Sequence, residues 1–85
     1  MIVEHALEIS AICPVDGKPD VYQCVVTTAR VIDVESILKA ADSLKDRKIY
    51  QEDLTQELHR ILAAQVETFG WHSGVRTKVT VGGDS

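Results

Sequence analysis

A stiff connection between two strand-like segments constrains the fold of this chain more than any other feature. Both prolines of the sequence lie in segment 14–20, together with the turn-forming pair Asp16-Gly17. Proline fixes φ and donates no backbone hydrogen bond, so this segment is expected to form a loop outside any central strand. Residues 3–13 alternate between apolar and polar side chains, and residues 21–32 are rich in β-branched ones. The sequence therefore predicts two antiparallel strands joined by a loop longer than a tight hairpin turn.

Cys13 ends the apolar face of the first predicted strand, at the entrance of this loop. That face consists of Val3, Leu7, Ile9, Ala11 and Cys13, and the other face carries Glu4, Glu8 and Ser10. Because successive side chains point to opposite faces of a strand, the thiol is expected to point the way the core points.

Two helices are expected after the strands. Asp33 is the expected N-cap of the first, with Glu35 in its first turn, and residues 46–48 end it. The second is expected to run from Tyr50 to Phe69, with Gly70 as its C-terminal stop. Its apolar residues follow the helical period: Leu54, Leu58, Ile61, Leu62, Val66 and Phe69.

A third strand is predicted over residues 75–81, where apolar and polar side chains alternate again. The order strand-strand-helix-helix-strand predicts an α+β fold, with both helices on one face of an antiparallel sheet. The chain has 85 residues, which suits a single domain spanning residues 1–85. A chain of this size buries only about 60% of its unfolded surface, so association of several copies is expected to help stabilise it.

Composition argues against several classes of protein. The net charge of −4 argues against a protein that grips the nucleic-acid backbone, which requires clustered Lys and Arg. No apolar run approaches the roughly 20 residues of a membrane span. The first residues lack the pattern of a signal peptide, so a cytoplasmic location is expected. In that compartment Cys13 and Cys24 are expected to be free thiols, with Cys24 in a packing role.

Cys13 and Asp20, at the two mouths of the loop, suit nucleophilic chemistry. A thiolate attacks electrophiles, and a carboxylate near it is able to move a proton to or from the reacting group. The alternative interpretation is a buried structural cysteine beside a stiff turn. Glu52, at the start of the second helix, either satisfies the helix dipole or accepts two N–H bonds from a guanine-like ring edge.

The histidines do not suggest a metal site. His5, His59 and His72 have no metal-ligand spacing with one another or with the cysteines, so no bound metal is expected. His59 is expected at the surface, whereas His72 precedes a Ser-Gly turn and is expected to border a binding pocket.

The segment Cys13-Pro14-Val15-Asp16-Gly17-Lys18-Pro19-Asp20 resembles the Cys-Pro-x-Thr-Gly-Gln-Pro-Asp motif of the nitrile reductases of queuosine biosynthesis. The resemblance implies a tunnelling fold that assembles into a ring or barrel, with active sites at subunit interfaces. It also implies that Cys13 adds to the nitrile carbon of 7-cyano-7-deazaguanine, giving a covalent thioimide, and that Asp20 transfers a proton. Glu52 matches the glutamate that binds the deazaguanine base, and Gln51 stands where the family has a histidine.

The first helix departs from the reductase pattern. The reductases carry Glu-Ser-Lys-Ser-Leu-Lys there, a segment that serves NADPH. Glu35 and Ser36 match it, but Ile37 replaces the first lysine and Lys39 is one place out of register, which is about 100° of rotation on a helix. Amidine-forming relatives, similar to archaeosine synthase, keep the cysteine and the aspartate without the NADPH motif and work on tRNA.

The sequence thus leaves several functions open. The first is a reductase-like enzyme that forms a thioimide through Cys13 and binds its substrate with Glu52, Glu35, Ser36 and His72. The others are an amidine-forming enzyme that uses ammonia, a binding protein that holds a purine or pterin through Glu52 without turnover, and a structural subunit without a small ligand.

Overall fold

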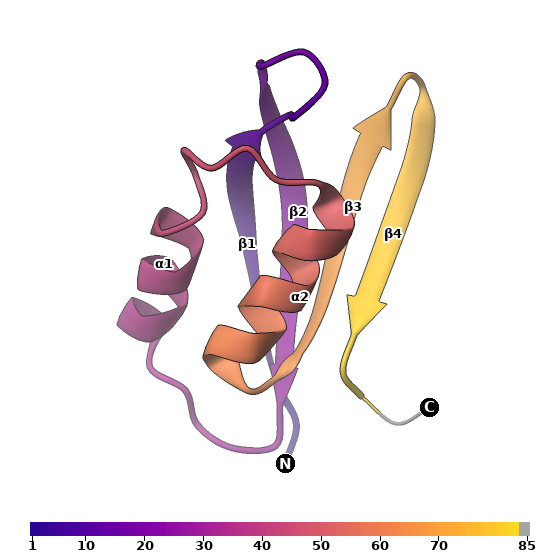
Figure 1. Ribbon diagram of the computed structural model, residues 1–85. Helices are drawn as coiled ribbons and strands as arrows, with labels where there is room; N and C mark the ends of the chain where they lie inside the picture. Colours follow the sequence, from indigo (N-terminus) through magenta and orange to yellow (C-terminus); the bar gives the residue numbers. More distant parts are fainter. Residues whose placement is uncertain (84–85) are drawn as a thin grey trace.

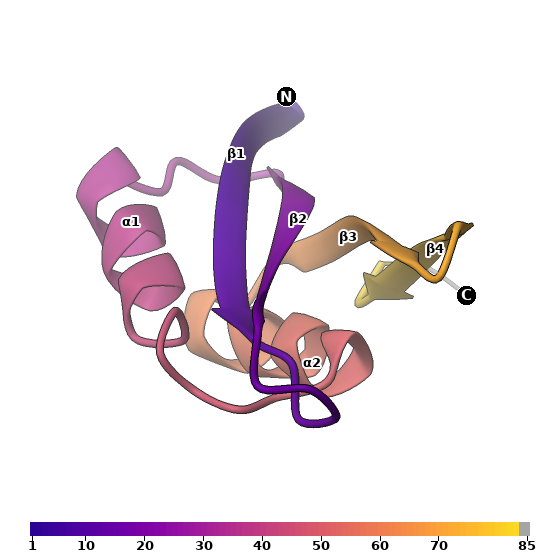
Figure 2. The same ribbon diagram turned by 90° about the horizontal axis from the view of Figure 1, so that it is seen from above.

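Four antiparallel strands and two helices make up the computed structural model, which describes residues 1–83 (Figure 1). The strands lie in the sheet in chain order. The elements are β1 (Val3–Ile12), β2 (Pro19–Thr28), α1 (Val34–Asp42), α2 (Gln51–Leu62), β3 (Gln65–His72) and β4 (Val75–Val81). Both helices lie on the same side of the twisted sheet, and no other element of residues 1–83 covers its opposite face (Figure 2). The predicted α+β class is confirmed. Asp84 and Ser85, the last residues of the predicted domain, lie outside the described part.

The strands on either side of the proline loop pair as predicted, with different limits. In the antiparallel register of β1 and β2, Ala11 faces Asp20 and Ile12 faces Pro19. The prediction that Pro19 and Asp20 belong to the loop is wrong, because a proline is tolerated as the first residue of a strand. Strand β2 also ends earlier than predicted, at Thr28.

Helix α1 begins where the sequence predicts. The Asp33 carboxylate accepts hydrogen bonds from the backbone N–H of Ser36 (2.8 Å) and from its hydroxyl (3.1 Å), which is the N-cap arrangement. The helix ends at Asp42, before the predicted end at residues 46–48.

The prediction of one long helix over residues 50–69 is wrong. Helix α2 ends at Leu62, because Ala63 takes the left-handed conformation (φ 50°, ψ 44°). From Gln65 onward the side chains alternate between the two faces of the sheet, and β3 adds the strand that the predicted order lacked. Leu62, Val66 and Phe69 happen to follow a helical spacing, and periodicity alone does not distinguish the two structures in so short a run.

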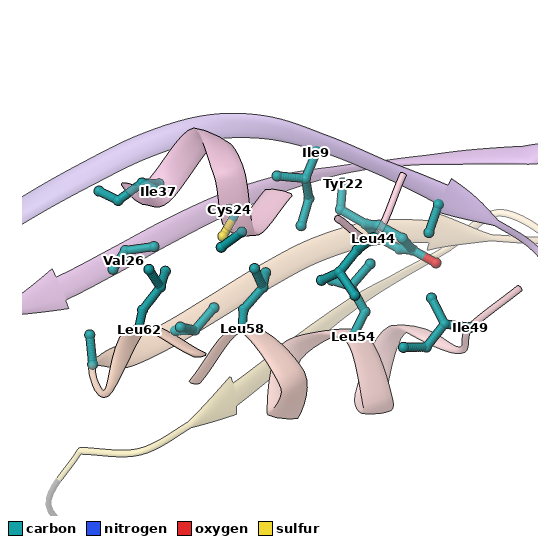
Figure 3. Packing of buried hydrophobic residues seen from close by; sticks show 14 of the residues in the cluster. Ile9, Tyr22, Cys24, Val26, Ile37, Leu44, Ile49, Leu54, Leu58 and Leu62 are labelled. Atoms are coloured by element: carbon teal, nitrogen blue, oxygen red, sulfur yellow. The ribbon is translucent and has the colours of Figure 1, made fainter. Parts of the chain in front are cut away.

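A single apolar core fills the space between the sheet and the helices (Figure 3). Leu54, Leu58 and Leu62 line the inner side of α2 and face side chains of the sheet. The principal sheet residues of the core are Ile9, Tyr22, Cys24, Val26 and Val66. Cys24 is 1% exposed and belongs to this core, which confirms its packing role. Burial raises the pKa of its thiol to about 11. Cys13 and Cys24 are both free thiols.

The topology gathers three connections at one end of the sheet. These are the β1–β2 loop, the α1–α2 connection where it leads into α2, and the β3–β4 turn. Helix α1 begins at the opposite end (Figure 1). Backbone hydrogen bonds fasten the α1–α2 connection to the end of β1: Ile12 N–H donates to the Arg47 carbonyl (2.9 Å) and Ile49 N–H to the Ile12 carbonyl (3.1 Å). The start of α2 is thereby held beside Cys13.

Within residues 1–83, neither helix has the length and apolar character that a membrane crossing requires.

Candidate active site

A cavity of about 230 Å³ opens at the end of the sheet where these three connections meet. Its walls are formed by Cys13, Pro14, Val15, Asp20, Tyr22, Tyr50, Gln51, Glu52 and His72. Cys13, Asp20, Glu52 and His72, which the sequence singled out, therefore border one space although they come from separate segments. An adjoining hollow of about 410 Å³ shares Cys13, Asp20 and His72 and adds Trp71.

The loop holds Cys13 by its own backbone. Cys13 N–H donates to the Lys18 carbonyl (2.8 Å), and Gly17 N–H donates to the Cys13 carbonyl (2.9 Å). The side chain of Cys13 is partly buried, so the thiol is fixed in position and still borders the cavity. Asp16 is a neighbour that the sequence indicated only as a turn residue. The Lys18 backbone N–H donates a hydrogen bond to the Asp16 carboxylate and so lowers the pKa of Asp16. A hydrogen bond with the Cys13 thiol lowers this pKa as well.

Asp20 pairs with a buried tyrosine that the sequence did not single out. The Tyr22 hydroxyl donates to Asp20 Oδ2 over 3.3 Å, and Tyr22 is only 2% exposed. Burial, followed by the negative charge of Asp20, raises the pKa of Tyr22 well above its usual range. The phenol therefore stays protonated and orients Asp20 at the cavity wall.

Gln51 is the second site residue whose role the sequence did not reveal. It is 1% exposed, at the first position of α2. Its Nε2 donates to the backbone carbonyls of Thr68 (3.2 Å) and Thr77 (3.0 Å), and its Oε1 lies 2.7 Å from His72 Nε2. A polar residue at the start of a helix gives no sequence signal of burial, because such positions are usually exposed.

Glu52 occupies the exposed first turn of α2 at the cavity wall. None of the ion pairs found among residues 1–83 involves it. The N-cap residue Tyr50 makes no capping hydrogen bond with its side chain, so the first N–H groups of the helix lack that partner. Glu52 is thus a carboxylate available to a ligand.

Glu35 and Ser36 do not join this site within one copy of the chain. They lie in the first turn of α1, at the opposite end of the sheet from Cys13 (Figure 1). Ser36 is bonded to Asp33, and Glu35 lines a separate surface groove with Leu38, Lys39 and Asp42.

The other predictions concern histidines and metals. His59 is expected at the surface from the sequence, but it is partly buried. Its Nδ1 lies 2.7 Å from the Ala64 carbonyl oxygen near the end of α2. Within residues 1–83 no group of His, Cys, Asp and Glu side chains is arranged to hold a metal ion.

The architecture is similar to a crystal structure of the archaeosine synthase QueF-Like in its apo form. The TM-score is 0.83, 21% of the aligned residues are identical, and the match covers 94% of this chain and 90% of that chain. The likeness confirms the tunnelling fold. No family model matches the chain, and no curated protein matches it.

Proposed function

We propose that this protein is an enzyme that binds a 7-deazaguanine nitrile and attacks it through Cys13. The observation that carries this proposal is the shared cavity, in which a thiol, an oriented carboxylate and a second, unpaired carboxylate face the same space. The name of the structural neighbour, an archaeosine synthase, supports the same class of substrate.

Each residue supplies one part of the chemistry. Glu52 accepts hydrogen bonds from the N–H groups of the guanine-like ring edge. The Cys13 sulfur forms a bond to the nitrile carbon while one C–N π bond opens. The thiol proton moves to the nitrile nitrogen through Asp20, which gives a neutral thioimide without oxidation or reduction. An acidic protein suits a small purine-like substrate better than tRNA, whose phosphates favour clustered cations.

Helix α1 does not fit a site for NADPH. Position 37, where the reductase motif has its first lysine, holds an isoleucine that is 4% exposed and packed in the core (Figure 3). A core side chain cannot bind a phosphate. We therefore favour ammonia over a nicotinamide cofactor as the second substrate, with an amidine as the product.

Assembly into a ring is the second part of the proposal, and the charges of the sheet support it. The registers place Glu8 on β1, Gln23 on β2, Phe69 on β3 and Lys78 on β4 in one row across the sheet. One edge strand thus carries an acid and the other edge strand a cation at the same level. A head-to-tail contact between β1 of one copy and β4 of the next pairs these opposite charges.

A ring also offers a way to unite the predicted substrate-binding residues. Glu35 and Ser36 lie at the far end of α1 from the cavity of their own copy. Glu35 and Ser36 therefore reach a cavity only if it belongs to a neighbouring copy. Such an arrangement places the active sites at subunit interfaces.

Intact-mass measurement after mixing with 7-cyano-7-deazaguanine tests the proposal, together with an ultraviolet spectrum. We expect a covalent adduct that is lost in Cys13→Ala and kept in Cys24→Ala, the matched variant of the buried thiol. Glu52→Ala should abolish binding. Adding ammonia should release an amidine, and adding NADPH should release nothing.

The other outcomes decide against parts of the proposal. Binding without an adduct, lost in Glu52→Ala, would make the chain a purine-binding protein without turnover. No interaction of the assembled protein with the nitrile would leave a structural subunit.

A further inference from the structure

A directed chain of hydrogen bonds runs from the core to His72. The Thr55 hydroxyl donates to the Gln51 carbonyl (2.7 Å) and lies 2.7 Å from the Thr68 hydroxyl oxygen. The Thr55 hydroxyl donates its one proton to the Gln51 carbonyl. The hydrogen bond between the two hydroxyls is therefore donated by Thr68 and accepted by Thr55. The Thr68 oxygen in turn accepts from Gln51 Nε2 over 3.1 Å.

This chain determines how the Gln51 amide is oriented. The backbone oxygens of Thr68 and Thr77 only accept hydrogen bonds, so the NH₂ group of Gln51 must face them. The amide oxygen consequently faces His72 Nε2 at 2.7 Å. An amide oxygen only accepts, so Nε2 of His72 is the donor and carries a proton. In the neutral ring the free lone pair is then on Nδ1.

The surroundings keep that nitrogen available to a ligand. His72 is an exposed residue at the end of β3 and lines both hollows that Cys13 lines. Its ring is also held against Tyr22, with centroids 6.1 Å apart. Among residues 1–83, the His72 ring makes its hydrogen bond through Nε2 and none through Nδ1, and the residue is exposed.

We propose that His72 is the general base of the second step and that Gln51 positions it, an inference that rests on the proposed function. Ammonia forms a bond to the thioimide carbon while the C–N π bond opens onto the imine nitrogen, and the attacking nitrogen loses a proton to Nδ1 of His72. The electron pair on the imine nitrogen then re-forms the π bond as the C–S bond breaks. The Cys13 sulfur leaves with the electron pair of that bond, and the imidazolium returns the proton to it. The products are an amidine and the free thiol.

The arrangement follows the pattern of a nucleophile, a histidine and an orienting amide. Here no hydrogen bond joins Cys13 to His72 within residues 1–83, and both side chains border the same cavity.

A two-stage measurement tests the role of His72. The Cys13 adduct is formed first, ammonia is then added, and its decay is followed by intact mass across pH. His72→Ala should still form the adduct, but the second step should slow about 100-fold or more, well beyond any change in the first step. With rates expressed per concentration of neutral ammonia, the fall in rate toward acidic pH should disappear in the same variant. His59→Gln, a histidine outside the cavity, should retain both the rate and its pH dependence.

Nitrogen NMR of the unliganded protein tests the tautomer without any substrate. We expect the proton of His72 on Nε2, and a mixture of tautomers with a slower second step in Gln51→Leu. A proton on Nδ1 in the unchanged protein, or an identical pH profile in His72→Ala, would overturn the inference while the adduct remained. If no adduct forms at all, the proposed function fails and the role of His72 fails with it, whereas the spectrum still decides the tautomer.

Discussion

Gly70 lies directly against the ring of Tyr22. A Cβ atom at Gly70 would approach the ring carbons Cδ1 and Cε1 to 2.6 Å, which is closer than real Cβ contacts allow. The backbone of β3 therefore comes near the tyrosine only because position 70 has no side chain. The same tyrosine holds Asp20 through its hydroxyl, so a glycine in β3 helps to shape a wall of the cavity.

Gly70→Ala should displace the Tyr22 ring and weaken its bond to Asp20. We expect the free energy of unfolding to fall by about 1–3 kcal/mol, as in other overpacked cores, and adduct formation at Cys13 to slow. Urea unfolding and intact-mass kinetics measure the two effects. Tyr22→Leu in the same chain should relieve the crowding but not restore the rate. Unfolding of Gly70→Ala at the same urea concentration as the unchanged protein would contradict this relation.

Because the Cys24 thiol is buried, the free energy of unfolding should fall as pH rises in the alkaline range. Its pKa in the folded protein is about 11, against an ordinary value of 9.0. Between these values the unfolded chain loses the proton while the folded protein keeps it, so the folded state binds more protons and its stability falls as pH rises. Below pH 9 this contribution is fully present.

Denaturant midpoints measured from pH 8 to pH 11 check this dependence on Cys24. In Cys24→Ala the decline should be shallower, whereas Cys13→Ala should retain it. The raised pKa of Tyr22 acts in the same direction above about pH 10, the ordinary tyrosine value. The dependence attributed to Cys24 is refuted if both cysteine variants decline in parallel with the unchanged protein.

The proposed ring should respond to charge reversal at the sheet edges. Glu8→Lys places a cation opposite Lys78 of the next copy, and like charges at paired strand positions are destabilising by several tenths of a kcal/mol or about 1 kcal/mol for each pair. Because this repulsion recurs at every contact between copies, Glu8→Lys should shift the assembly toward smaller species in sedimentation experiments at low salt.

The reciprocal change serves as the control. Combining Glu8→Lys with Lys78→Glu restores opposite charges between copies and should recover much of the assembly. Lys78 also pairs with Glu67 within the chain at 3.3 Å, so the recovery should be incomplete. Lys45→Glu, a reversal in an exposed helical-end pair, should leave the assembly unchanged. Equal sedimentation of all these variants would argue against a contact between β1 and β4.

Asp33→Ala should lower stability without altering the cavity of its own copy. Loss of the N-cap bonds to Ser36 should cost about 1 kcal/mol, within the range of 0.5–2 kcal/mol for such caps. Asp33 caps the start of α1, which lies at the opposite end of the sheet from the cavity of its own copy. The Cys13 thiol should therefore react with a small alkylating reagent at the same rate under folding conditions. A large loss of that rate would mean that the two ends of the sheet are coupled.

Local patterns in the sequence determined most of the secondary structure and the types of residue at the candidate site. The alternation around the proline loop indicated the β1–β2 pair, Asp33 indicated the start of α1, and the alternation over residues 75–81 indicated β4. The types of residue at Cys13, Asp20 and Glu52 indicated their possible chemistry. These features depend on backbone conformation and side-chain direction within a few neighbouring residues, which a sequence expresses directly.

The tertiary structure alone decided the fourth strand and the composition of the site. Strand β3 forms because its backbone pairs with β2 on one side and β4 on the other, and the helical spacing of its apolar residues conceals this. The attachment of Ile12 to the segment before α2 brings Cys13 beside Gln51 and Glu52. The orientation of His72 depends on carbonyl groups from two strands. Contacts between segments far apart in the chain leave no local pattern, so packing and not periodicity assembled the candidate active site.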